Sequence, residues 1–146
     1  MSRRLVHVDD RGSALLEFIV VGVLILIPIA YLVLSVMRVQ AAVFASTQAV
    51  REAGRAFVTA DSVPRAQQRA VSAARLAFND QGFALPAQAL TVRCRPAHCL
   101  TPGGVVDVEA RWVVPLPWLP ATLGEVASVP IRAVHTLPVD TYRVAG

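Results

Sequence analysis

The chain has 146 residues and a formal net charge of +4, a length that suits one modest domain or a domain with an anchor and excludes a multidomain enzyme. Apolar residues make up 55% of it, which excludes an intrinsically disordered protein. All 14 basic residues are arginines scattered along the sequence, whereas a nucleic-acid groove needs clustered basic residues with interleaved aromatics. We therefore expect no nucleic-acid partner.

Residues 18–37 form the most apolar stretch: none is charged, and 17 of the 20 are apolar. At about 1.5 Å of rise per residue, a helix of this length crosses the roughly 30 Å hydrocarbon core of a bilayer. Pro28 is compatible with such a helix, because the carbonyl that it leaves free is accommodated by local adjustment. We predict one transmembrane helix over residues 13–37, with membrane lipid as a partner, and exclude a polytopic membrane protein.

The flanking charges predict the orientation of this helix. Arg3, Arg4 and Arg11 precede it, while Arg38 and then Arg51 follow it. Because positive charge favours the cytoplasmic side, we expect a single-pass protein of the cytoplasmic (inner) membrane, with its N-terminus inside and its larger C-terminal part outside.

A secretory signal peptide is an alternative interpretation. The sequence Val43-Phe44-Ala45 before Ser46 has the small residues of a signal peptidase site, and a secreted protein would then begin at Ser46. Against it, the apolar region of a signal peptide has only ~7 to 15 residues, and this site lies within a pattern that continues as a helix.

An acidic residue, Glu17, stands at the N-terminal edge of the apolar stretch. A carboxylate is costly to bury in hydrocarbon, so Glu17 either lies at the membrane interface or pairs with a positive charge supplied from elsewhere. If the chain were cut after Gly12, Ser13 would gain an α-ammonium group and Glu17 would become the fifth residue. Glu17 of one copy could then pair with the ammonium of an adjacent copy, and each charge would offset the other's desolvation in a low-dielectric helix bundle.

These residues resemble the class III signal of type IV pilins, in the Flp and TadE-like branch of the tight-adherence (Tad) system. The resemblance consists of a short basic leader, a glycine, four residues, a glutamate, an aromatic residue and an unbroken apolar helix. It implies that a prepilin peptidase removes the leader, residues 1–12, by cleavage between Gly12 and Ser13. It also implies that Glu17 and Phe18 take part in subunit assembly.

Two features make the chain more similar to TadE-like pseudopilins than to Flp pilins. Phe18 stands where Flp pilins usually have tyrosine, and Flp pilins are little more than the helix. The partners implied are the prepilin peptidase, other pilin and pseudopilin subunits and the Tad inner-membrane platform, with incorporation into a surface pilus as one outcome. An uncleaved envelope anchor or interaction protein is the other alternative.

Beyond the apolar stretch, apolar residues recur every three or four positions, which predicts that the helix continues over residues 38–60. The run 48–56 resembles the Ala-Arg-Glu-Gly-Ala-Arg signature of TadE-like proteins, with Ala53 and Gly54 in swapped order. A face of small residues would let another helix approach closely; it consists of Ala45, Ala49, Ala53 and Ala56.

Residues 61–146 are predicted to form an extracytoplasmic α+β domain. Asp61 or Ser62 caps a second helix that has Pro64 in its first turn and stops near Gly82. Apolar residues then alternate with a period of two, which predicts strands over 90–94, 106–114 and 129–137, the last with Pro130 marking an edge position. We expect the second helix to pack on a small antiparallel sheet. The C-terminal run 137–143 also resembles the Pro-Val-Asp, Tyr-Arg ending of TadE-like proteins.

Few residues of the domain suggest a disulfide, a metal site or a catalytic site. Cys94 and Cys99 lie close in sequence, and outside the membrane a short-loop disulfide is favoured over a zinc site, because His98 is badly placed to complete a tetrahedron with both thiolates. Asp107 and Glu109 share a strand face and could pair as a metal or acid-base site, but Arg111 on the same face favours an exposed ion ladder. Since no catalytic or cofactor motif can be assembled, we expect no enzyme activity, cofactor, metal or small-molecule substrate.

Overall fold

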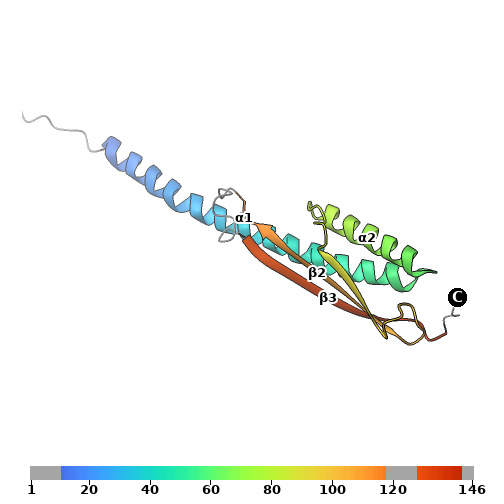
Figure 1. Ribbon diagram of the computed structural model, residues 1–146. Helices are drawn as coiled ribbons and strands as arrows, with labels where there is room; N and C mark the ends of the chain where they lie inside the picture. The colour runs from blue at the N-terminus through green and yellow to red at the C-terminus, as the bar shows by residue number, and fades with distance from the viewer. Residues whose placement is uncertain (1–10, 118–127, 143–146) are drawn as a thin grey trace, which may run out of the picture. The chain divides into compact units, whose positions relative to one another are not determined.

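The computed structural model describes residues 11–117 and 128–142, and side chains from residue 14 onward within these ranges. The elements follow in the order α1 (Arg11–Val58), α2 (Val63–Asp80), β1 (Leu90–Arg95), β2 (Val105–Pro115) and β3 (Ser128–Pro138) (Figure 1). The predicted α+β class, with a long first helix, a second helix and three antiparallel strands, is confirmed. Most of the expected leader, residues 1–10, and Arg143 lie outside the described residues.

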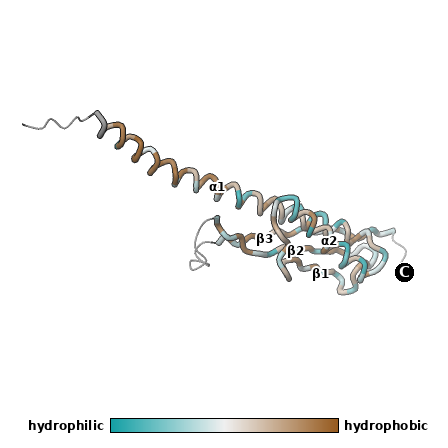
Figure 2. Tube along the Cα trace, turned by 90° about the horizontal axis from the view of Figure 1, so that it is seen from above, coloured by the Kyte–Doolittle hydropathy of each residue, from teal (hydrophilic) through white to brown (hydrophobic). Residues whose placement is uncertain are grey.

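The chain divides into two units, one ending at Val36 and one beginning at Met37. In the first unit, α1 stays helical through Pro28. Figure 2 shows that this part of α1 is hydrophobic along most of its length. Tyr31 and Ser35 on one side of this helix are half-buried, whereas its large apolar side chains are exposed: Leu15, Leu16, Phe18, Ile19, Val20, Val21, Val23, Leu24, Ile25, Leu26, Ile27, Ile29, Leu32, Val33, Leu34 and Val36. By length and composition α1 can cross a membrane, as a transmembrane helix or as a signal sequence.

The second unit contains the sheet, whose order is β1-β2-β3 with both pairings antiparallel. The central strand β2 alternates between buried and more exposed residues along most of its length, as its period of two predicts. β3 lies at the edge of the sheet and contains Pro130, opposite Val113, as well as Pro138, opposite Val105. The expected edge position of Pro130 is therefore confirmed.

The core of this unit is built from valines of the sheet and alanines of both helices. Val106, Val108 and Val114 of β2 are completely buried. From α1 and α2 come alanines that are nearly or fully inaccessible: Ala42, Ala45, Ala49, Ala53, Ala66, Ala70, Ala74 and Ala77. The small-residue face of α1 is thus largely covered within this chain's own domain.

A tryptophan joins both helices to the inward face of the sheet. Trp112 on β2 donates a hydrogen bond from Nε1 to Oγ of the buried Ser46 on α1, at 2.8 Å. Its ring also packs against Phe78 of α2 and against Phe83, with ring centroids 5.0 and 5.1 Å apart. The guanidinium of Arg38 in turn lies 5.0 Å from the centre of the Phe83 ring. One buried side chain therefore positions elements that are far apart in sequence.

Gly54 lies where a side chain of β3 packs directly against α1. A Cβ atom built at residue 54 would overlap the side chain of Leu137 on β3 and would lie 3.5 Å from Cγ2 of Val108. Glycine gives up helix propensity but allows a close backbone approach. The glycine of the run 48–56 therefore has a packing role inside the domain.

The start and the end of α2 agree with the capping residues expected from the sequence, except that the expected capping hydrogen bond is not formed. The capping residue is Ser62, and its side chain makes no capping hydrogen bond. Beyond the helix, Gly82 has a φ of +74°, a left-handed conformation that glycine adopts without strain.

Candidate functional site

The residues predicted to carry processing and assembly lie at the start of α1. Because the helix begins at Arg11, Gly12 and Ser13 belong to its first turn, and their side chains are outside the described ones. Glu17 is exposed one and a half turns later, next to Phe18, whose exposed fraction is 77%. Among the described residues no ion pair or hydrogen bond involves the Glu17 carboxylate, so its charge is open to a group from another molecule.

The two cysteines form a disulfide that closes the loop after β1. The Cys94 and Cys99 Sγ atoms are 2.01 Å apart and their Cα atoms 5.2 Å apart. Within the loop, Oγ1 of Thr101 donates to the carbonyl oxygen of His98 at 2.7 Å. Both sulfurs are used in the bond, which leaves the zinc interpretation without thiolate ligands in this state. The bridge constrains the end of a strand.

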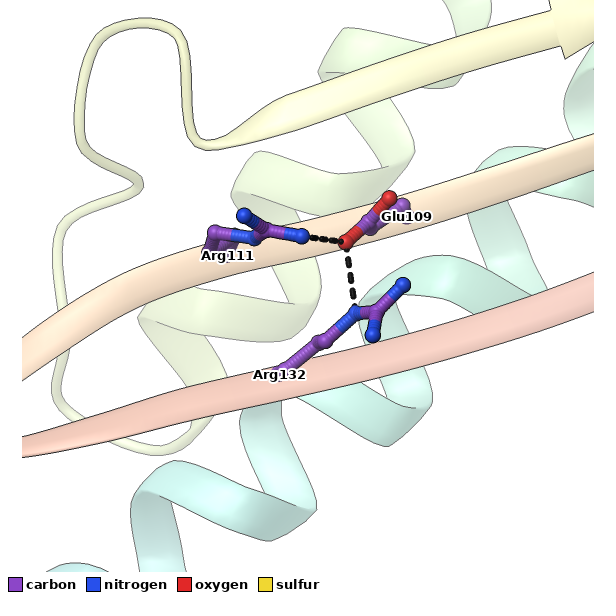
Figure 3. A network of polar contacts seen from close by, with 3 residues as sticks. All are labelled: Glu109, Arg111 and Arg132. Atoms are coloured by element: carbon purple, nitrogen blue, oxygen red, sulfur yellow. Dashed lines mark hydrogen bonds and ion pairs between the residues drawn. The ribbon is translucent and has the colours of Figure 1, made fainter.

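The outward face of the sheet carries a polar network centred on Glu109 (Figure 3). Its Oε1 accepts a hydrogen bond from Nη2 of Arg111 and another from Nε of Arg132, both at 2.7 Å. The expected pair of Glu109 with Arg111 is confirmed. Arg132 is an additional member that the sequence analysis missed, because its place opposite Arg111 depends on the register between β2 and β3.

A second network lies on the same face, around Asp107. Nη2 of Arg95 on β1 is 2.7 Å from Oδ2 of Asp107, and Oγ1 of Thr136 on β3 donates to its Oδ1 at 2.6 Å. The two carboxylates of β2 are thus each bound from a neighbouring strand.

The pKa of Glu109 is lowered from its ordinary value of 4.5, first by the hydrogen bond from Arg111 and then by the one from Arg132. A carboxyl group with a lower pKa in the folded than in the unfolded state stabilises the fold above its unfolded pKa. This contribution is lost as the pH falls through the folded pKa.

We therefore expect the difference in free energy of unfolding between the wild type and Glu109→Gln to shrink between about pH 6 and about pH 3. Urea unfolding followed by tryptophan fluorescence measures it. Glu52→Gln is the control, because no ion pair joins Glu52 to a described residue. A difference that stays constant over this pH interval would contradict the assigned ion pairs.

A shallow hollow of about 240 Å³ lies between α1 and β3, lined by Arg51, Glu52, Arg55, His135 and Leu137. It is open to solvent. Within the described part of the chain, no ion pair links its charged side chains with one another. The hollow brings together the basic residues of the run 48–56 and a histidine 80 residues later, a proximity that the sequence alone does not indicate.

This chain matches no protein-family model, no curated protein and no solved structure. Of the features described, the exposed apolar helix with a single carboxylate has the largest surface left without a partner. The sheet face has the densest set of charged contacts.

Proposed function

We propose that this chain is a single-pass, non-enzymatic pseudopilin of the TadE-like kind, which takes part in assembling a Tad pilus. The observation that carries the proposal is the first unit: a helix that exposes large apolar side chains along its length, with one carboxylate, Glu17, five residues beyond Gly12. A prepilin peptidase would act after Gly12. Other pilin and pseudopilin subunits and the Tad membrane platform would be the partners.

The exposed apolar surface of this helix needs lipid or protein around it. Sixteen large apolar side chains from Leu15 to Val36 are exposed. Burying each one contributes ~1.5 to 3 kcal/mol, so the sum reaches tens of kcal/mol. A bilayer provides this burial, and so does a bundle of similar helices in a filament. The helix can thus pass from one environment to the other without exposing its side chains to water.

Glu17 distinguishes an assembling helix from a plain anchor. A carboxylate within an apolar helix is unfavourable in lipid unless it is paired. Cleavage after Gly12 would create an ammonium group at Ser13 that pairs with Glu17 of a neighbouring subunit. Such a pair also sets the axial register between subunits, since both charges have to meet at the same height.

N-terminal processing tests the proposal. When the chain is expressed with the matching prepilin peptidase, intact mass and N-terminal sequencing of the membrane-derived protein should show a product of 134 residues that begins at Ser13. Gly12→Val should prevent this cleavage, because the added side chain occupies the position before the cut bond. Gly22→Val is the matched control: a Cβ at residue 22 meets no atom within 4 Å, so processing should be unchanged.

The other products have distinct meanings. A chain of 146 residues beside an active peptidase would remove the pseudopilin assignment and leave an uncleaved envelope anchor. A chain that begins at Ser46 would show that the apolar helix is part of a signal peptide.

A further inference from the structure

The outward face of the sheet gathers four arginines from all three strands. Cross-strand register places them with Asp107 and Glu109 on the face opposite the buried valines. We call this surface the arginine face; its basic members are Arg93, Arg95, Arg111 and Arg132. Four guanidinium groups over two carboxylates give it a local charge of +2.

The solvent-exposed surface of the arginine face is more positive than its local charge of +2 indicates. The side chains of Glu109 and Asp107 are only 15% and 24% exposed, whereas those of Arg95, Arg111 and Arg132 are 69%, 68% and 63% exposed. The carboxylates are therefore shielded from solvent, and the guanidinium groups lie on the outside of the face. A molecule approaching the sheet meets guanidinium groups first.

The guanidinium groups of Arg111 and Arg132 are held in place by Glu109 and still have N–H donors that Glu109 does not use. Arg111 and Arg132 are directly opposite each other in the register, an unfavourable placement for like charges that the Glu109 carboxylate between them relieves. Each uses one nitrogen on Glu109, although a guanidinium carries five N–H donors. Since the contact with Glu109 already restricts both side chains, a carboxylate that binds them costs less side-chain entropy.

The size of the face and its apolar neighbours indicate the kind of partner. Along β2 the face runs from the position of Arg95, opposite Val105, to Arg111, about 20 Å at 3.4 Å per residue. That is too long for one small anion. Val113 and Val134, with exposed fractions of 55% and 52%, lie on the same face. No aromatic ring for stacking on nucleic-acid bases occurs on this face among the described residues.

We propose that the arginine face binds an acidic segment of a second protein, in which carboxylates alternate with apolar side chains. The carboxylates would pair with the guanidinium groups and the apolar side chains would cover Val113 and Val134. A second copy of the face does not fit, because arginine would meet arginine. The surface lies within the second unit, and its binding does not depend on N-terminal processing.

Fluorescence anisotropy of a labelled (Glu-Val)4 peptide, titrated with the full chain in nanodiscs of zwitterionic lipid, tests this surface. We expect saturable binding, and a Kd at least tenfold higher for the double variant Arg111→Gln/Arg132→Gln. The double variant Arg69→Gln/Arg75→Gln, on exposed positions of α2, removes the same charge elsewhere and should change the Kd less than 1.5-fold.

A further variant separates loss of binding from loss of structure. Arg93→Gln leaves both carboxylate networks intact and should still raise the Kd about threefold, with an unchanged tryptophan emission spectrum.

Three results would overturn the proposal. They are no binding of the peptide by the wild type, equal weakening by the two double variants, and binding of a (Glu-Ser)4 peptide or a thymidylate oligonucleotide as tight as that of (Glu-Val)4. The second result would mean that peptide binding depends only on the net charge of the chain. The third would mean that apolar side chains of the partner do not contribute to binding.

Discussion

Gly54→Val is expected to lower the free energy of unfolding of the domain by about 1 to 3 kcal/mol, the usual range for overpacking a core. The first added carbon already overlaps the side chain of Leu137, and the completely buried Val108 closes the other side. Leu137 has to leave its rotamer or β3 has to move away from α1. This loss is a large part of the 5 to 15 kcal/mol typical of a folded domain.

Urea unfolding of the full chain in detergent micelles, followed by tryptophan fluorescence, measures the change in midpoint. Gly54→Ala should cost less than Gly54→Val, since the end of one leucine side chain can shift. Leu137→Ala should recover part of the loss in a double-mutant cycle. Gly22→Val, at an open position of the first unit, is the control. An unchanged midpoint for Gly54→Val would contradict the close contact between Leu137 of β3 and α1 at residue 54.

Glu17→Leu is expected to abolish association with pilin-like subunits while leaving membrane insertion intact or improved. Leucine removes the desolvation penalty of the carboxylate and, with the carboxylate, the proposed partner of a Ser13 ammonium. Co-purification from membranes with other pilin subunits, and counts of surface pili, measure the effect. We expect both to fall to the level of a strain without the protein.

A charge-shifted variant provides the matched control for this result. Leu16→Glu combined with Glu17→Leu keeps the composition and moves the carboxylate by one residue, about 100° around the helix. It should fail as Glu17→Leu does, because the position of the charge matters as well as its presence. Normal piliation by either variant would show that Glu17 is only an interfacial residue.

Local patterns were enough to predict the elements of this fold. Period-two alternation placed the strands at 90–94, 106–114 and 129–137, and the structure extends them by a residue or less at each end, to Leu90–Arg95, Val105–Pro115 and Ser128–Pro138. Alternation reports which side chains are buried, whereas backbone pairing continues past the last alternating residue. That difference explains the slightly longer strands.

Contacts between distant segments could not be predicted in the same way. Trp112 and Ser46 are 66 residues apart, and Arg132 meets Glu109 across 23 residues. Both contacts depend on how a strand is placed against its neighbour or against α1, which no local pattern specifies. The shielding of the two carboxylates beneath the arginines has the same origin, and for this reason the arginine face was not anticipated as a binding surface.

The two prolines of β3 also affect how copies of this domain can lie beside one another. An edge strand offers a row of free amide donors on which a strand from another chain can extend the sheet, a common route to aggregation. Pro130 and Pro138 are eight residues apart and so belong to the same row, and neither has an amide hydrogen to donate. Only a short stretch of donors is left between them. Sheet extension through the β3 edge is therefore disfavoured, so copies of this domain that lie side by side would meet through other surfaces, which include the β1 edge.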